Sequence, residues 1–204
     1  MNSRFLYDDG EETWEHKWHL GCGGVYLEGY TNADIEGLSA IDHPDLVRQN
    51  TTTIVDYYAR LNGDIHALPT RRQTVVDVRS DAVRWAAMPY AIDKIVSVQL
   101  LEHFTPVEAI TALRRWNSNL RRDGVLIVSV PDMRGTLELI ERGDGDTEFA
   151  IRHLRGRMGD KFNCHWAWYT TETLIELLEF MNFDKVFQLP NFHFYPAVVV
   201  KAIK

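Results

Sequence analysis

A glycine-rich turn after a short apolar run is the feature that most constrains the fold of this chain. The run Lys17-Trp-His-Leu leads into Gly21-Cys-Gly-Gly24, and a second short run ends at Asp34. Glycines after a strand let the backbone approach a ligand closely, because no Cβ is in the way. An aspartate at the end of the next strand can accept two hydrogen bonds from a ribose diol. Together they predict a nucleoside pocket at the carboxyl edge of a parallel sheet.

Strands and helices alternate along the chain, which is the pattern of a doubly wound α/β fold. The longest apolar strand is expected at 92–100, and such a continuous run suits a strand buried on both faces. A helix follows at Thr105, where Pro106 and Glu108 complete a capping box, and Asp123-Gly124 ends it. The other predicted strands are 18–21, 30–35, 74–78 and 125–130. Thr170 or Thr171 is expected to cap the last helix. A terminal antiparallel pair of strands is predicted at 184–189 and 197–202.

Three segments depart from simple alternation. Only eight residues separate Gly21 from Tyr30, too few for the usual crossover helix, so we expect an abbreviated loop there. Residues 37–73 are predicted to be an insertion, with a helix that begins at His43-Pro-Asp45 and runs to Asn62-Gly63. This insertion could cover the substrate or form a dimer contact. The region 142–163, rich in Gly, Arg and Asp, predicts a lid or irregular helix.

Length and composition exclude several classes of protein. The 204 residues suit a single domain with a full core, preceded by an acidic arm at 1–16. A net charge of −7 argues against an extended phosphate-binding surface, so nucleic acid is not the expected partner. Cys22 and Cys164 are the only cysteines, which indicates free thiols in a reducing cytoplasm. No apolar run approaches the ~20 residues of a membrane span, and no secretory leader is visible.

Three acids recur near predicted strand ends, where open α/β sheets bind their ligands. Asp34 is expected to hold ribose hydroxyls, and Asp77 could accept the exocyclic amine of a purine. Asp132 follows the strand at 125–130 and is a reserve candidate for acid–base chemistry. The alternative is that such aspartates only cap the turn that follows each strand.

A polar group follows the central strand, where the reacting centre of a ligand would lie. His103 could remove a proton from an acceptor hydroxyl, since its unperturbed pKa of about 6.5 suits a base at neutral pH. Glu102 could orient that imidazole or contact the cofactor. The alternative is a structural role, in which His103 packs beneath the next helix and bonds to a backbone carbonyl.

Aromatic residues cluster in the stretch 163–169, just before the last helix. His165, Trp166 and Trp168 could wall a substrate pocket, since small-molecule sites are lined by aromatics with a few polar groups. Equally, they could fix a loop to the core. His16 and His19 have no third ligand near in sequence, so we expect no metal site.

Five motifs, in order, resemble those of class I S-adenosylmethionine-dependent methyltransferases, above all the small type-11 enzymes. The segments 19–23 and 30–34 are similar to the family patterns LNLGCG and GWINVD. The segments 88–104 and 121–132 resemble LPF…D.I….VLEHF and LKPGG.L.ISVPD, and 165–174 resembles HKWAYT.E.L. The resemblance covers about 17–35 and 74–183. The family's usual path to the acid is longer than the one here, and the insertion at 37–73 has no counterpart in these patterns.

The resemblance implies a mostly parallel seven-stranded sheet whose last strand is antiparallel, with S-adenosylmethionine as cofactor. The residues that it places around the cofactor are Leu20, Gly21, Cys22 and Gly23 for the methionine part, Asp34 and Ile35 for the ribose, Asp77 and Val78 for the adenine, and Gln99 and Leu100 beneath the sulfonium. The Asn-Pro-Pro-Tyr motif of enzymes that methylate base amines is absent, which disfavours a nucleic-acid acceptor.

The expected activity is therefore methyl transfer to a small molecule, a sugar of a glycan or a lipid precursor, with a homodimer possible. One rival is a catalytically inactive protein that keeps the fold and binds a partner. A second rival is a dinucleotide-dependent oxidoreductase, but that class needs a full GxGxxG and an acid about 20 residues further on.

Overall fold

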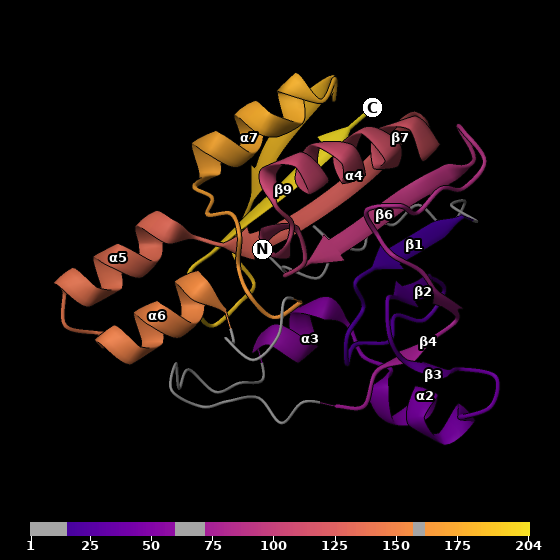
Figure 1. Ribbon diagram of the computed structural model, residues 1–204, viewed down its shortest axis with the longest axis horizontal. Helices are drawn as coiled ribbons and strands as arrows, with labels where there is room; N and C mark the ends of the chain where they lie inside the picture. The colour runs from indigo at the N-terminus through magenta and orange to yellow at the C-terminus, as the bar shows by residue number, and fades with distance from the viewer. Residues whose placement is uncertain (1–15, 60–71, 157–161) are drawn as a thin grey trace.

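A single seven-stranded sheet organises the molecule (Figure 1). The computed structural model describes residues 16–59, 72–156 and 162–204. The strand order across the sheet is β5-β2-β1-β6-β7-β9-β8. The five strands from β5 to β7 pair in parallel, while β9 runs antiparallel to both β7 and β8. The predicted sheet, mostly parallel and ending in an antiparallel pair, is confirmed.

The strands of this sheet lie close to the predicted positions. They are β1 (Lys17–Leu20), β2 (Thr31–Asp34), β5 (Val78–Arg79), β6 (Ile92–Val98), β7 (Leu120–Pro131), β8 (Lys185–Leu189) and β9 (Ala197–Ile203). All seven residues of β6 are buried, as expected for a central strand covered on both faces. A separate two-stranded sheet joins β3 (Leu38–Ser39) to β4 (Val75–Val76).

Capping residues fix where the longer helices begin. Thr105 accepts a hydrogen bond from the Glu108 backbone at the start of α4 (Pro106–Asn119), and the Glu108 side chain bonds back in a capping box. Thr170 forms the equivalent box with Thr173 at the start of α7 (Thr171–Phe180). Both predicted caps are thus confirmed, although α4 ends four residues before the predicted Asp123-Gly124 stop. The remaining helices are α2 (Pro44–Asn50), α3 (Ile54–Ala59), the 3₁₀ turn η1 (Leu101–His103), α5 (Met133–Glu141) and α6 (Thr147–Arg155).

Helices cover the sheet on both faces. On one face, α4 and α7 lie side by side (Figure 1) and bury Leu113, Trp116 and Leu174 against strand residues such as Leu126. The indole Nε1 of Trp116 donates to the carbonyl of Ala82 at 3.0 Å, so this large buried ring leaves no unpaired donor.

The second face is covered differently, because the connection from β1 to β2 contains no helix. The abbreviated loop predicted for this connection is confirmed. Its residues Val25 and Leu27 turn inward and share a buried cluster with Val96 and with Ile54 of α3. The region predicted as an insertion thereby supplies a helix that covers the sheet where the crossover helix would lie.

Several other predicted elements differ in the structure. The single helix expected after His43 is two helices, α2 and α3, separated at 51–53. The strand expected at 74–78 is divided between β4 and β5, which belong to different sheets. The helix α5 was not predicted, and α6 is a regular helix within the region expected to be a lid; the two pack as a hairpin (Figure 1). Residues 1–15 of the predicted arm at 1–16, and the predicted helix end at 62–63, lie outside the described residues.

Among the helices of the described segments, none combines the length and the apolar character needed to cross a membrane.

Candidate active site

The strand order reverses between β1 and β6, and this places the site. From β1 the chain continues to β2 on one side, and from β6 it continues to β7 on the other. The loops that follow β1 and β6 therefore leave the sheet in opposite directions at its carboxyl edge. Open α/β sheets bind ligands at such a point. The glycine turn and the segment 99–104 are the two loops that meet here.

The glycine turn has a backbone that other residues adopt with strain. Gly21 and Gly23 have φ angles of +66° and +52°, both in the left-handed region. A Cβ at Gly21 would lie 2.7 Å from Cδ2 of Leu100, whereas one at Gly23 would meet no atom of the described residues within 4 Å. Leu100 thus closes one side of the turn, and no described residue fills the side in front of Gly23.

Cys22, between these glycines, points into the protein. It is 3% exposed, and its backbone N–H donates to the carbonyl of Ala33 at 3.1 Å. Burial raises the pKa of the thiol, with a further contribution from the charges of Asp34 and Asp77. The thiol is therefore neutral and inert, and only the backbone of Cys22 is placed to contact a ligand. Leu20, which precedes the turn, is fully buried.

Asp34 lies at the carboxyl end of β2, as predicted, and is joined to the glycine turn. The backbone N–H of Gly23 donates to its Oδ2 at 2.9 Å, and the N–H of Glu36 donates more weakly to Oδ1 at 3.4 Å. The carboxylate is half-buried, so it keeps access to solvent. The neighbouring Ile35 is 43% exposed. The turn and the acid thus converge on one place at the edge of the sheet.

Asp77 does not lie at the edge where we predicted it. Strand β5 begins after it and pairs Val78 with Ala33, so Asp77 is at the amino end of that strand. Its Oδ1 accepts from the Tyr26 hydroxyl at 2.6 Å, and its Oδ2 accepts from the Asn32 backbone at 2.7 Å. These bonds occupy the carboxylate. Burial of the Tyr26 ring, followed by its hydrogen bond to Asp77 and the charge of that residue, raises the pKa of Tyr26 to about 12. Asp77 therefore braces β2 rather than facing the carboxyl edge.

The acid at the carboxyl end of β5 is Asp81, which sequence reasoning missed. The N–H of Ser80 donates to the carbonyl of Asp34 at 2.8 Å, which brings the end of β5 beside the end of β2. Asp81 Oδ1 accepts from the N–H of Val83 at 2.9 Å, and Arg84, which is largely exposed, lies 3.7 Å from Oδ2. If the strand predicted at 74–78 had been extended by two residues at its carboxyl end, Asp81 would have been the acid that directly follows it.

Gln99 and Leu100, which the family resemblance places beneath the cofactor, directly follow β6, because this strand ends two residues before the predicted end at 100. Gln99 has a φ of +54°, unusual for a residue with a side chain, and its N–H donates to the carbonyl of Ser129 at 2.8 Å. The Nε2 of Gln99 is buried without a hydrogen-bond partner among the described residues. This strained turn directs the chain into η1, which carries Glu102 and His103.

Glu102 is the least expected group of the site. Its side chain is 1% exposed, and neither carboxylate oxygen has a hydrogen-bond partner within the described segments. Burial raises the pKa of Glu102 to about 8. The backbone carbonyl of Glu102 accepts from the N–H groups of Trp166 and Ala167 at 2.8 and 3.2 Å. These bonds hold the segment before α7 against η1.

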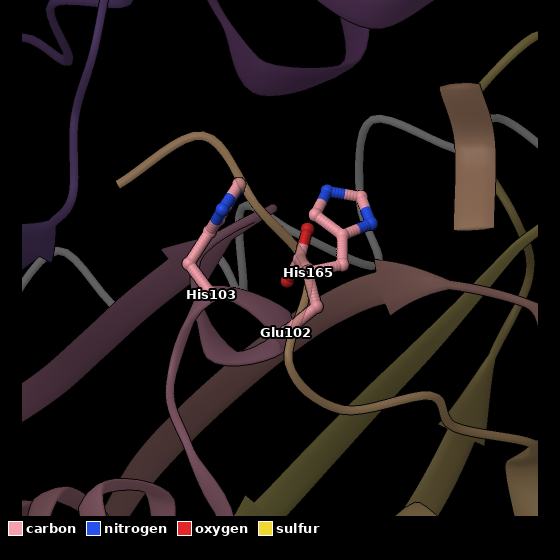
Figure 2. A group of neighbouring side chains, drawn as sticks. All are labelled: Glu102, His103 and His165. Carbon is pink, nitrogen blue, oxygen red and sulfur yellow. The ribbon is translucent and has the colours of Figure 1, made fainter. Parts of the chain in front are cut away.

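His103 and His165 come together beside this carboxylate (Figure 2). Their rings meet edge to face with centroids 4.7 Å apart. His103 Nδ1 lies 3.1 Å from the carbonyl of Cys164, and since a carbonyl only accepts, Nδ1 is the donor of this hydrogen bond. Burial, followed by the nearby His103 and His153, lowers the pKa of His165 to about 3. The bond from His103 to a backbone carbonyl, which was stated as the structural alternative, is therefore present.

The other predicted residues have mixed placements. Asp132 is the N-cap of α5, where its Oδ1 accepts from the Arg134 N–H at 3.0 Å, which is the alternative stated for such an acid. Trp166 and Trp168 are 51% and 55% exposed, and the Trp168 Nε1 donates to the carbonyl of Leu154. His19 is buried and bonds to Asn32, and burial lowers its pKa to about 4, so it belongs to the core.

We predicted no metal site, yet Glu102, His103 and His165 each offer a ligand-type atom, all within 4.8 Å of one another. The sequence did not reveal this group, because His165 lies far along the chain from the other two.

Comparison with known proteins identifies the fold. No family model and no curated protein matches the sequence. Solved structures do match, at low identity. An S-adenosylmethionine-dependent methyltransferase from Archaeoglobus fulgidus matches with a TM-score of 0.56 and 14% identity, over 98% of this chain and 91% of that one. The chain has the fold of class I methyltransferases.

Two further matches are of the same kind. The 1,6-didemethyltoxoflavin-N1-methyltransferase of Burkholderia thailandensis, solved with its substrate and S-adenosylhomocysteine, matches with a TM-score of 0.56 and 16% identity, over 99% of this chain and 76% of that one. The methyltransferase SibL in its apo form matches at a TM-score of 0.56 and 14% identity, and this chain spans 54% of its length. In this class I methyltransferase fold the antiparallel strand β9 lies between β7 and β8. The dinucleotide-binding fold differs, because its sheet has six strands in the order 3-2-1-4-5-6.

Proposed function

We propose that the protein transfers a methyl group from S-adenosylmethionine to a small-molecule acceptor, such as a metabolite, a glycan sugar or a lipid precursor. The observation that carries the proposal is the bond between the Gly23 N–H and Asp34, at the reversal point of the sheet. The space in front of Gly23, which no described residue fills, and the half-buried Asp34 carboxylate fit a nucleoside there. When bound, the cofactor supplies a methyl group activated by a sulfonium charge.

Each residue at the edge would have its own part. Asp34 would accept hydrogen bonds from the ribose hydroxyls, and the Gly21–Gly23 backbone would lie against the methionine part. We assign the adenine amine to Asp81 in place of Asp77, because Asp81 stands at the carboxyl end of β5. Ile35 and Val78, both exposed, would contact the flat faces of the adenosine.

His103 would be the residue that acts on the acceptor. Its Nδ1 proton is held by the Cys164 carbonyl, so Nε2 can take a proton from an acceptor hydroxyl or amine. The exposed Trp166 and Trp168 would form an apolar wall for the acceptor. Alignment of donor and acceptor and the exclusion of water account for most of the rate in such a transfer.

Mass spectrometry of freshly purified protein tests the proposal directly. We expect bound S-adenosylmethionine or S-adenosylhomocysteine, and calorimetric binding of either compound to the emptied protein. A screen of acceptors by radiolabelled methyl transfer would follow. In that assay His103→Ala is expected to lower turnover while the affinity for the cofactor stays within about twofold. A protein that neither retains nor binds the cofactor would be a binding scaffold instead.

A further inference from the structure

The pairing of Glu102 with two histidines raises a problem of charge. Glu102 and His103 lie in η1, and His165 comes from the segment before α7 (Figure 2). A carboxylate buried to 1% exposure, with both oxygens unbonded, is costly to keep ionised. No salt bridge between Glu102 and a Lys or Arg is found among the described residues. The carboxylate therefore needs either a proton or a neighbouring positive charge.

The histidines are arranged as ligands of a metal ion usually are. A ligating imidazole typically donates its second N–H to a carbonyl or carboxylate, which fixes the tautomer and aims the other nitrogen at the metal. His103 does this through Nδ1 and the Cys164 carbonyl at 3.1 Å. In His165 the buried Nδ1 has no hydrogen-bond partner among the described residues. Each ring thus offers one nitrogen as a ligand-type atom close to the Glu102 carboxylate.

We propose that Glu102, His103 and His165 bind one divalent transition-metal ion of the Zn²⁺ kind. Their ligand atoms lie within 4.8 Å of one another, and closure onto an ion with bonds of about 2.0–2.2 Å needs only a small contraction, to roughly 3–4 Å. Two imidazoles and one carboxylate suit Zn²⁺, Fe²⁺ or Co²⁺ better than Mg²⁺ or Ca²⁺, which prefer oxygen ligands.

Three protein ligands leave at least one coordination position open, as in catalytic rather than structural zinc sites. The site adjoins Gln99 and Leu100, which directly follow the central strand β6. Resting on the proposed function, the open position would hold an oxygen atom of the acceptor, such as that of an alcohol or phenol. Coordination lowers the pKa of a bound hydroxyl, so with the ion bound it is the ion, and no longer His103 Nε2 as a base, that would prepare the acceptor for transfer.

Calorimetric titration of the chelator-treated protein with Zn²⁺ tests the site. We expect one ion per chain with micromolar or tighter affinity, and a visible absorption spectrum of bound Co²⁺ when that ion is used as the probe. Glu102→Gln and His165→Asn should each weaken Zn²⁺ binding at least about 100-fold, the upper end of effects seen around metal sites. Glu179→Gln, which changes an exposed Glu of α7, is the matched control and should bind Zn²⁺ as the wild type does.

Thermal unfolding keeps the test independent of activity and of folding defects. Zn²⁺ should raise the Tm of the wild type and of Glu179→Gln, while Glu102→Gln should fold without the ion and show no rise. Absence of Zn²⁺ binding to the wild type, or equal binding to Glu102→Gln and His165→Asn, would overturn the proposal. Titration of S-adenosylmethionine into the same samples distinguishes the metal-site proposal from the methyltransferase proposal. If the protein binds the cofactor but does not bind Zn²⁺, only the metal site is refuted. If it binds Zn²⁺ but does not bind the cofactor, only the methyltransferase assignment is refuted.

Discussion

The backbone N–H of Gly23 donates a 2.9 Å hydrogen bond to Oδ2 of Asp34, and so the glycine turn and the acid of the next strand form one unit. Asp34 ends β2, and Gly23 lies in the turn that follows β1, the parallel neighbour of β2 in the sheet. The short connection between them needs no helix, because this bond and the one from Cys22 to Ala33 fix the turn directly onto β2. The geometry presents a carboxylate and an open glycine backbone to the same space.

Replacement of Asp34 by Ala is expected to weaken S-adenosylmethionine binding by about 1–3 kcal/mol, the scale of hydrogen bonds to a charged group. Isothermal titration calorimetry measures the change. Asp45→Ala is the control, since Asp45 is an exposed residue of α2 that pairs only with Arg48 in the described structure. Unchanged affinity in Asp34→Ala would remove this residue from the binding site.

The two glycines of the turn should respond differently to the same substitution. Gly21→Ala adds a Cβ only 2.7 Å from Leu100 at a φ of +66°, so we expect a loss of about 2–4 kcal/mol of folding stability from strain and overpacking together. In Gly23→Ala the added Cβ meets no atom of the described segments within 4 Å, so its cost should be limited to about 1–2 kcal/mol from the positive φ.

Urea unfolding and cofactor titration together distinguish the two variants. Gly23→Ala should fold but lose affinity for S-adenosylmethionine, since its methyl group would project into the open space. Leu100→Ala should restore part of the stability of Gly21→Ala and none of the affinity of Gly23→Ala. If both single variants were equally unstable, steric contact with Leu100 would not be what requires glycine at 21.

The burial of Glu102 predicts a particular dependence of stability on pH in metal-free protein. Its pKa is raised from 4.5 to about 8 in the folded state, so between these values the folded protein holds a proton that the unfolded chain has lost. Stability should therefore fall as pH rises from about 4.5 to about 8, by roughly 2–5 kcal/mol in total. Below pH 4.5 this contribution is constant.

Comparison of the wild type with Glu102→Gln separates the effect of Glu102 on the pH dependence of stability from the effect of the buried histidines. The lowered pKa values of His19 and His165 act at the acid end, where stability is lost as pH falls below about 6.5 in both proteins. The difference in unfolding free energy between wild type and Glu102→Gln should thus change across pH 4.5–8 only through residue 102. A constant difference would mean that the carboxyl group has an ordinary pKa.

Local signals of the sequence predicted most of the fold. Capping boxes at Thr105 and Thr170, the continuous apolar strand β6 and the glycine turn are each encoded within a few residues, so propensity and hydrophobic pattern were sufficient. The break between α2 and α3 and the division of the strand at 74–78 were not predictable in this way, because each depends on pairing with distant segments.

The same distinction applies to the site. The position of Asp34 followed from its own strand, whereas Asp77 was misplaced because the register of a two-residue edge strand decides which acid stands at its end. The group of Glu102, His103 and His165 exists only once the segment before α7 has folded across η1. Its side chains come from two regions that no spacing rule connects.

Ile54 tests whether α3 replaces the missing crossover helix. It is 9% exposed and shares a cluster with Val25, Leu27 and Val96. Ile54→Ala is expected to cost about 2–4 kcal/mol of stability, the usual range for removing a buried Ile side chain. Ile41 offers a matched control, because it is 90% exposed and Ile41→Ala should change stability by less than about 0.5 kcal/mol. Chemical unfolding measures both, and equal effects would mean that α3 is not a structural part of the sheet's second face.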